Sequence, residues 1–139
     1  MYFRAQGRRG FSLVELMIVV VIIGLLAGTV TLYVPAYLTQ AKQNAARHEI
    51  STIVQALEAF YATYGRYPTN DEGLAVLTQP TEKIAEPLLK GMPTDPWSKP
   101  YQYNCPGRTQ PYEVICYGAD GREGGEGADA DIGSDNLKK

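Results

Sequence analysis

The feature that most constrains this chain is an apolar segment near its N-terminus, residues 11–34, whose only charged side chain is Glu15. As a helix rising about 1.5 Å per residue, the segment would be roughly 36 Å long. That length is enough to cross a bilayer core of about 30 Å. The segment is too long for the apolar part of an ordinary signal peptide, and no small-residue cleavage signal follows it. We therefore expect a retained transmembrane helix.

The residues on either side of this segment differ in charge. The first ten residues contain Arg4, Arg8 and Arg9 and no acid. Because the whole chain has a net charge of −2, the remainder carries −5. A basic flank stays on the cytoplasmic side, so the C-terminal part should face outward. An acidic exported domain gives no reason to expect nucleic-acid binding.

A helical pattern continues beyond the apolar segment. Apolar side chains recur there at intervals of three and four residues: Ile50, Ile53, Val54, Leu57, Phe60, Tyr61 and Tyr64. This spacing predicts an amphipathic continuation, and so one long helix from about Ser12 to Tyr64. Pro35 should bend it, because proline removes a backbone hydrogen bond. Gly65 should end it.

The rest of the chain predicts shorter elements. Residues 71–77 could form a short helix with Asn70 as its N-cap. Aromatic and β-branched residues predict strands at residues 101–105 and 112–117, joined by a loop at residues 106–111. The expected fold class is α+β, in which a long N-terminal helix packs on a small antiparallel sheet.

The two cysteines, Cys105 and Cys116, lie in these expected strands. If the hairpin register is centred on the intervening loop, we expect the two residues to lie opposite or nearly opposite each other, which favours a disulfide. An even number of cysteines in an exported domain permits such a bond. Two free buried thiols are the alternative.

The C-terminal segment, residues 118–136, is acidic and rich in glycine, and we expect it to make no core. Calcium takes six to eight oxygen ligands from a chain that folds sharply, which spaced aspartates and glycines can supply. The spacing fits no EF-hand. A solvated acidic tail is the alternative. Its acidic residues are Asp120, Glu123, Glu126, Asp129, Asp131 and Asp135.

Glu15 is the most unusual residue of the apolar segment. A carboxylate near the start of a membrane helix is costly and is normally functional. It could pair with the free amino terminus of a neighbouring subunit, which would require cleavage between Gly10 and Phe11. A glutamate anchored at the membrane interface beside the arginines is the alternative, and position alone does not decide between them.

The sequence RRGFSLVELMIVVVIIGLLA resembles the class III signal of the type IV pilin superfamily. The resemblance implies that a prepilin peptidase cleaves after Gly10 and that Phe11 becomes the N-methylated amino terminus. It also implies that Glu15 sets the register of assembly. The chain would then divide into a leader at residues 1–10, a transmembrane and filament-core helix at residues 11–35, and a periplasmic domain at residues 36–139.

Three further stretches resemble the major pseudopilin family of type II secretion. They are RYPTNDEGL at residues 66–74, PTDPWSKPY at residues 93–101, and YGADG, GGEG and DADI within residues 117–132. The resemblance implies a pilin-like fold with a C-terminal calcium loop. The matching calcium ligands are the side chains of Asp120, Asp129 and Asp131 and the backbone carbonyl of Tyr117. Cys105 and Cys116 are not expected from this family pattern.

The same resemblance implies a structural role and no catalysis. The chain would be a single-pass inner-membrane protein that polymerises into a periplasmic filament, the pseudopilus, and drives export of folded proteins through the outer-membrane secretin. Its partners would be further copies of itself, minor pseudopilins, an inner-membrane assembly platform and the prepilin peptidase. The alternatives are a type IV pilin for adhesion, motility or DNA uptake, and a membrane-anchored calcium-binding module that never polymerises.

Overall fold

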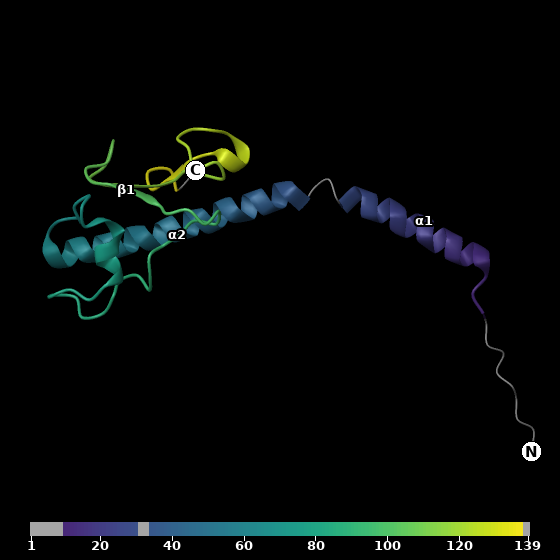
Figure 1. Cartoon of the computed structure of the whole chain (residues 1–139), viewed down its shortest axis with the longest axis horizontal. Helices are drawn as coiled ribbons and strands as arrows, with labels where there is room; N and C mark the ends of the chain where they lie inside the picture. Colours follow the sequence, from purple (N-terminus) through teal and green to yellow (C-terminus); the bar gives the residue numbers. More distant parts are fainter. Residues whose placement is uncertain (1–9, 31–33, 138–139) are drawn as a thin grey trace, which may run out of the picture. The chain divides into compact units, whose positions relative to one another are not determined.

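A computed structural model describes residues 10–30 and 34–137 (Figure 1). The chain groups into two compact units, which divide between Tyr37 and Leu38. The arginines of the predicted leader lie outside the described residues. So do residues 31–33, over which the single long helix was predicted to run.

The helix of the first unit, α1, spans Leu13–Val30. Ser12 caps it, because its hydroxyl accepts a hydrogen bond from the Glu15 amide (3.2 Å) while Glu15 Oε2 accepts one from the Ser12 amide (2.8 Å). This reciprocal pair is a capping box. Among the described residues, no helix has both the length and the hydropathy needed to cross a membrane.

The second helix, α2, spans Val34–Tyr64. Pro35 lies in its first turn, where a missing amide proton costs no helical hydrogen bond. The predicted end is confirmed, because Gly65 adopts a left-handed φ of +69° and its amide donates to the Tyr61 carbonyl (2.7 Å). Glycine enters this conformation without a steric penalty.

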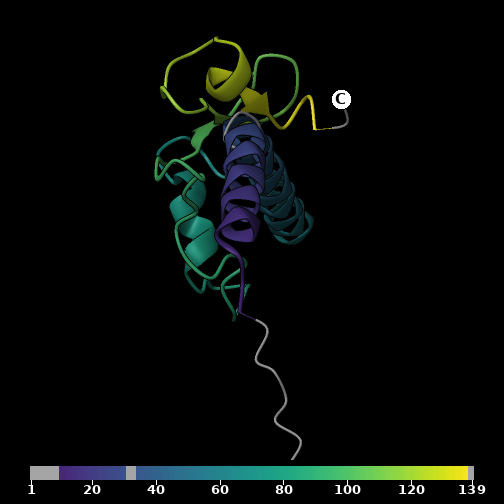
Figure 2. The same ribbon diagram turned by 90° about the vertical axis from the view of Figure 1, so that its right-hand side faces the viewer.

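One face of α2 forms the centre of the core of the second unit. Four of the seven apolar positions predicted from helical spacing are almost fully buried: Ile50, Ile53, Leu57 and Phe60. Tyr61 is instead 45% exposed. In Figures 1 and 2 the sheet and the yellow C-terminal loop lie along α2, with the teal segment after the helix packed beside its C-terminal half. The residues that the sheet and loops add to this core include Leu74, Leu77, Tyr103, Val114 and Ile132.

The sheet has three antiparallel strands in the order β1-β2-β3, namely Gln102–Asn104, Glu113–Cys116 and Ile132–Gly133. The first two confirm the predicted hairpin. The third was not predicted, since the acidic segment was expected to make no core. Ile132 is 2% exposed and pairs with Cys116, so the end of this segment is built into the sheet.

The short helix after α2 also differs from its prediction. It is a 3₁₀-helix, η1, spanning Gly73–Thr78. Thr69 and Glu72, rather than Asn70, satisfy the amides that precede it, through reciprocal hydrogen bonds of 2.8 and 3.3 Å. The side chain of Asn70 instead accepts a hydrogen bond from the Cys105 amide (2.7 Å).

The hairpin register corrects the inference about the cysteines. It pairs Tyr103 with Val114 and Asn104 with Glu113, so it is centred on the loop as expected. Continued by one pair, however, it places Cys105 opposite Tyr112. Cys116 then lies four residues further along the strand, about 13 Å away at roughly 3.3 Å per residue. Disulfide-bonded residues have Cα atoms within about 7 Å. The prediction of opposed cysteines was wrong, and both are free thiols in this structure.

Candidate functional site

The first candidate site is the start of α1. Gly10 is exposed, and the Phe11 side chain is 81% exposed, so the peptide bond between them is in an accessible segment that precedes the helix. Glu15 is also exposed, and its carboxylate holds the Ser12 amide. The site therefore presents the predicted cleavage position and the predicted assembly glutamate within residues 10–15, at and just before the first turn of α1.

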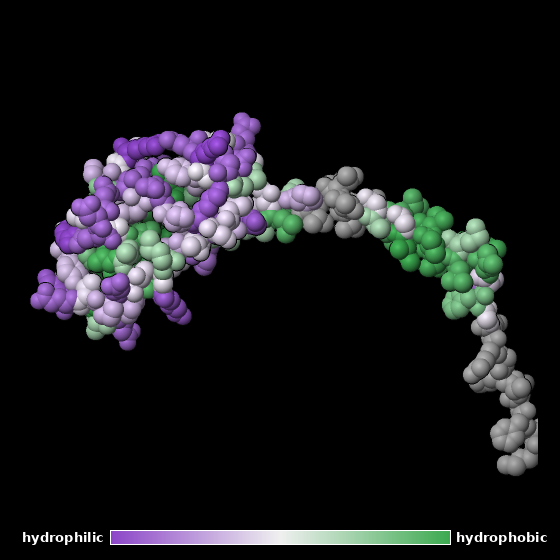
Figure 3. All heavy atoms as spheres, viewed as in Figure 1, coloured by the Kyte–Doolittle hydropathy of each residue, from purple (hydrophilic) through white to green (hydrophobic). Residues whose placement is uncertain are grey.

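The surface of α1 extends this site along the helix. Its large apolar side chains are all at least 47% exposed, from Leu13 to Leu26. Figure 3 shows apolar atoms covering the visible side of α1, whereas polar atoms dominate the visible surface of the second unit. The first unit by itself leaves this surface exposed, and burial of apolar area is the main driving force of association.

The second candidate site is the acidic loop, which we define as residues 117–131. It is a folded loop, not an extended tail. The Gly121 amide donates to the Tyr117 carbonyl (3.1 Å) and closes its first turn, and the Ala119 amide donates to the Ala128 carbonyl (3.0 Å) and joins its two limbs. A 3₁₀-helix, η2, spans Gly127–Asp129.

Glycine is required where the limbs of the acidic loop approach each other. Gly118 has a φ of +59°, and a Cβ atom there would lie 2.7 Å from the Asp129 carbonyl carbon. At Gly125, with a φ of +101°, a Cβ atom would lie 2.7 Å from the Asp129 carbonyl oxygen. Any other residue would push the limbs apart, so these glycines explain part of the loop's composition.

The four predicted calcium ligands all belong to this loop. Asp120 Oδ1 accepts a hydrogen bond from the Arg122 amide (3.0 Å), and Asp131 Oδ2 accepts one from the Gly124 amide (2.8 Å). The other oxygen, Asp131 Oδ1, is buried without a hydrogen-bond partner. A buried unpaired carboxylate oxygen is costly and fits a position for a cation.

The carboxylates of the loop do not form a metal site by themselves. In the part of the chain that the structure describes, no three acidic, histidine or cysteine side chains are grouped closely enough to hold a metal ion. A calcium ion would therefore need backbone carbonyls as well as carboxylates, which is usual for calcium. The unpaired oxygen of Asp131 fits that kind of ligand set. The Tyr117 carbonyl already accepts the Gly121 amide, so it would bind calcium through its second lone pair.

Three side chains from outside the acidic loop bind to it, and sequence reasoning missed all of them. Lys99 Nζ donates to the Ala119 carbonyl (2.6 Å), and Gln43 Nε2, from α2, donates to the Gly127 carbonyl (2.5 Å). Arg108 forms an ion pair with Glu123 (2.6 Å). Nothing in the local sequence signals these contacts, because the partners of Gln43 and Lys99 are far away along the chain.

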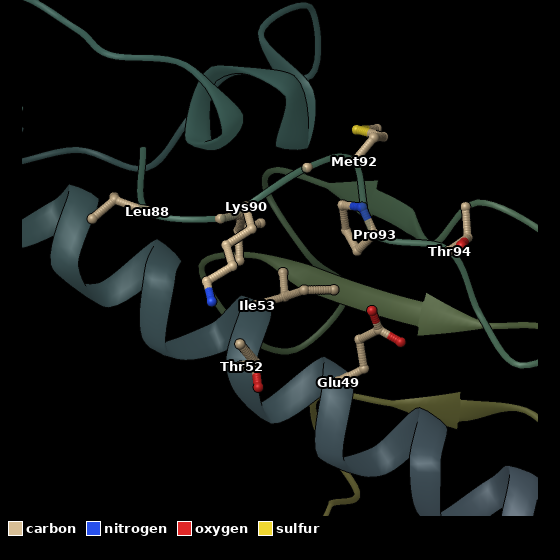
Figure 4. Close-up of a pocket in the computed structure, with 10 residues that line it drawn as sticks. Glu49, Thr52, Ile53, Leu88, Lys90, Met92, Pro93 and Thr94 are labelled. Carbon is tan, nitrogen blue, oxygen red and sulfur yellow. The ribbon is translucent and has the colours of Figure 1, made fainter. Parts of the chain in front are cut away.

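A groove of about 530 Å³ lies between α2 and residues 88–94. Figure 4 shows Glu49, Thr52 and Ile53 on the helix side, facing Lys90, Met92 and Pro93. Glu49 accepts a hydrogen bond from the Tyr101 hydroxyl (3.2 Å), and burial raises the pKa of that phenol. The Thr52 hydroxyl in this groove donates to the His48 carbonyl (3.1 Å).

Two family models match consecutive parts of the chain. The prokaryotic N-terminal methylation motif matches residues 6–31, which include the predicted cleavage position and Glu15. The model for type II secretion system protein G matches residues 34–135, which include α2, the sheet and the acidic loop. Together they cover both candidate sites.

Full-length relatives agree with these matches. The chain is 41% identical to the type II secretion system core protein G of Pseudomonas aeruginosa, over 93% of this chain and 96% of that protein. It is also 41% identical to the core protein G of Vibrio cholerae, over 97% of each. The core protein G of Escherichia coli K12 is 32% identical over 95% of this chain.

A solved structure agrees in fold. The crystal structure of the major pseudopilin from the type 2 secretion system of enterohaemorrhagic Escherichia coli superposes with a TM-score of 0.59 at 24% identity, covering 73% of this chain and 93% of that one. This match confirms the predicted α+β, pilin-like fold. From the family match and the relatives, the chain belongs to the type II secretion system protein G family.

Proposed function

We propose that this chain is the repeating structural subunit of the type II secretion pseudopilus. The observation that most strongly supports this role is α1, whose apolar side chains are exposed in the isolated chain behind an N-terminal methylation motif. Such a helix needs an apolar environment from outside the chain. The inner membrane would supply it before assembly, and the helices of neighbouring subunits would supply it in the filament.

Processing would prepare the subunit for assembly. A prepilin peptidase would cleave after the exposed Gly10, and Phe11 would become the methylated amino terminus. In the unassembled chain the Glu15 carboxylate accepts a hydrogen bond from the Ser12 amide. In the filament its carboxylate would pair with the new amino terminus of a neighbouring subunit, because a charge among apolar helices is costly unless it is paired.

The second unit would face the periplasm, and the filament would drive folded proteins through the outer-membrane secretin. Minor pseudopilins and an inner-membrane assembly platform would be its partners. Its work would be mechanical rather than catalytic. The groove at Glu49 and Lys90 would then have a structural role, and nucleic acid would not be a partner.

Substituting Glu15 by leucine tests the assembly role. We expect Glu15→Leu to abolish pseudopili or make them irregular, as seen by electron microscopy of cells that overproduce the subunit. The periplasmic domain should keep its circular dichroism spectrum. The matched control is Glu82→Leu, at an exposed glutamate of the second unit, which should give normal filaments. Normal filaments from Glu15→Leu would refute the role of Glu15.

We also propose that the acidic loop binds a structural calcium ion through the Tyr117 carbonyl and the side chains of Asp120, Asp129 and Asp131. The unpaired, buried Asp131 Oδ1 supports this proposal. Bound calcium would hold the two limbs of the loop together, because it would neutralise carboxylates that otherwise repel each other. The ion would contribute to folding and would take no part in chemistry.

Removal of calcium tests this second proposal. A ligand present at about 100 times its Kd stabilises a fold by roughly 2.7 kcal/mol, which for a domain of about 100 residues amounts to at least 10 °C in Tm. We expect EDTA to lower the Tm of the second unit by about 10 °C or more. Asp129→Ala should lower Tm similarly and remove the EDTA effect, whereas Asp71→Ala, at an exposed aspartate outside the loop, should change neither. An unchanged Tm in EDTA would reject the calcium site.

A further inference from the structure

We infer that the turn at residues 95–99 is the scaffold of the acidic loop, and that Lys99 is the positioning residue for the loop's first turn. The inference that Lys99 orders the loop does not depend on calcium. Its consequence for calcium affinity rests on the calcium site proposed above.

The turn is built around a buried carboxylate. Asp95 is 5% exposed, and its Oδ1 accepts hydrogen bonds from the backbone amides of Trp97 (2.9 Å) and Lys99 (2.8 Å). The Asp95 amide donates to the Lys99 carbonyl (2.7 Å). Hydrogen bonds to a carboxylate are about twice as strong as those between neutral groups. The backbone of Lys99 is therefore fixed at both its amide and its carbonyl.

The same carboxylate joins the turn to the base of the acidic loop. Asp95 Oδ2 accepts a hydrogen bond from Cys116 Sγ (3.3 Å), and Cys116 is the last residue of β2, directly before the loop. The turn and the loop thus share one buried anchor.

The Lys99 side chain makes the second connection between the turn and the acidic loop, to a residue 20 positions further along the chain. Its ammonium donates to the Ala119 carbonyl (2.6 Å), within the turn that the Gly121 amide closes onto the Tyr117 carbonyl. Gly121 has a φ of +70°, and a Cβ atom there would lie 2.7 Å from Lys99 Nζ. The loop backbone therefore packs directly on the ammonium, which explains why a glycine stands at this position.

This contact orders a segment that includes two of the proposed calcium ligands, Tyr117 and Asp120. A side chain that holds a binding segment in its bound conformation raises the affinity for the ligand. Less conformational entropy is then lost when the ligand binds. The ammonium also repels a calcium ion. Solvent screens that repulsion, because Lys99 is only partly buried. We expect the ordering effect to dominate.

Hydrogen–deuterium exchange on the full chain in detergent micelles, with EDTA present, tests the inference. In Lys99→Met, amides in the peptide covering residues 117–122 should exchange about tenfold faster than in the wild type, by analogy with typical coupling strengths. Lys99→Arg keeps the charge and the donors, so it should restore much of the protection. The matched control is Lys90→Met, at an exposed lysine of the groove, which should leave this peptide unchanged. Unchanged exchange in Lys99→Met would overturn the inference.

Calcium titration of the same proteins by calorimetry separates the two proposals. We expect Lys99→Met to bind calcium with a Kd about tenfold higher than the wild type and Lys90→Met to bind with the wild-type Kd. An equal or lower Kd in Lys99→Met would overturn the effect on affinity. If the wild type binds no calcium, the calcium proposal fails, and the exchange result in EDTA still decides the role of Lys99.

Discussion

The two helices of this chain are both rich in apolar residues but use them in opposite ways. Large apolar side chains lie on all sides of α1, and those from Leu13 to Leu26 are exposed. In α2 they follow one face, and Ile50, Ile53, Leu57 and Phe60 on that face are buried against the sheet and loops. The difference shows that α2 has its packing partner within its own unit, whereas the described residues of the first unit leave the apolar side chains of α1 uncovered.

Truncating one apolar side chain in each helix would test this contrast most strongly. Phe60 is 2% exposed at the centre of the core, so Phe60→Ala should destabilise the second unit by about 3–5 kcal/mol through lost burial and a cavity. Ile22 is 50% exposed, so Ile22→Ala should leave the unfolding of that unit unchanged. Chemical denaturation of the full chain in detergent, followed by the fluorescence of Trp97, measures both.

Two results would contradict this interpretation. If Ile22→Ala lowered the stability of the second unit as much as Phe60→Ala, α1 would be part of the same core. If Phe60→Ala had no effect, α2 would not be the centre of that core.

The elements predicted correctly from sequence depend on local patterns. The buried face of α2 follows from the spacing of Ile50, Ile53 and Leu57, and its end follows from Gly65. The hairpin follows from two short aromatic and β-branched segments around one loop. In each case the residues that determine the element are close together in the sequence, so their periodicity is visible without the fold.

The elements that were missed depend on contacts between distant residues. Ile132 forms a third strand only because the free edge of β2 can pair with it. The surrounding acidic sequence does not predict a strand. The side chains of Lys99 and Gln43 reach loop carbonyls that are 20 and 84 residues away. Of the proposed sites, the sequence predicts the calcium ligands and the cleavage position, but not the side chains that contact the acidic loop from outside it.

Acid should weaken the second unit at the end of α2, where an ion pair between Arg66 and Glu72 would be lost. Arg66, just beyond the helix, hydrogen-bonds Glu72 at 2.6 and 2.8 Å, and this contact together with the Thr69 amide lowers the pKa of Glu72 to about 2. A carboxyl group with a lowered pKa in the folded state stabilises the fold above its unfolded pKa. That stabilisation is lost as the pH falls from about 5 towards 2.

We therefore expect Glu72→Gln to cost roughly 1 kcal/mol at pH 7, since the pair is partly exposed and screened. The cost should shrink towards zero near pH 2, where the wild type loses the same contact. Denaturation of both proteins at several pH values measures the difference. Glu82→Gln, at an exposed glutamate, serves as the control. A cost for Glu72→Gln that stayed constant across this pH range would show that the charge of Glu72 is not what stabilises the turn.

Reduction should have the smallest effect, because the stability of the second unit comes from packing on α2 and not from a crosslink. Cys105 Sγ lies 3.5 Å from the Pro111 carbonyl, whereas Cys116 Sγ donates to Asp95, so the two sulfurs have different partners at different ends of the hairpin. A disulfide closing so short a loop would contribute about 3 kcal/mol, or at least 10 °C in Tm for a domain of about 100 residues. We expect dithiothreitol and Cys105→Ser each to leave Tm unchanged. A fall of that size on reduction would mean that the hairpin has a register different from the one that pairs Tyr103 with Val114, and the β1–β2 packing on α2 would have to change with it.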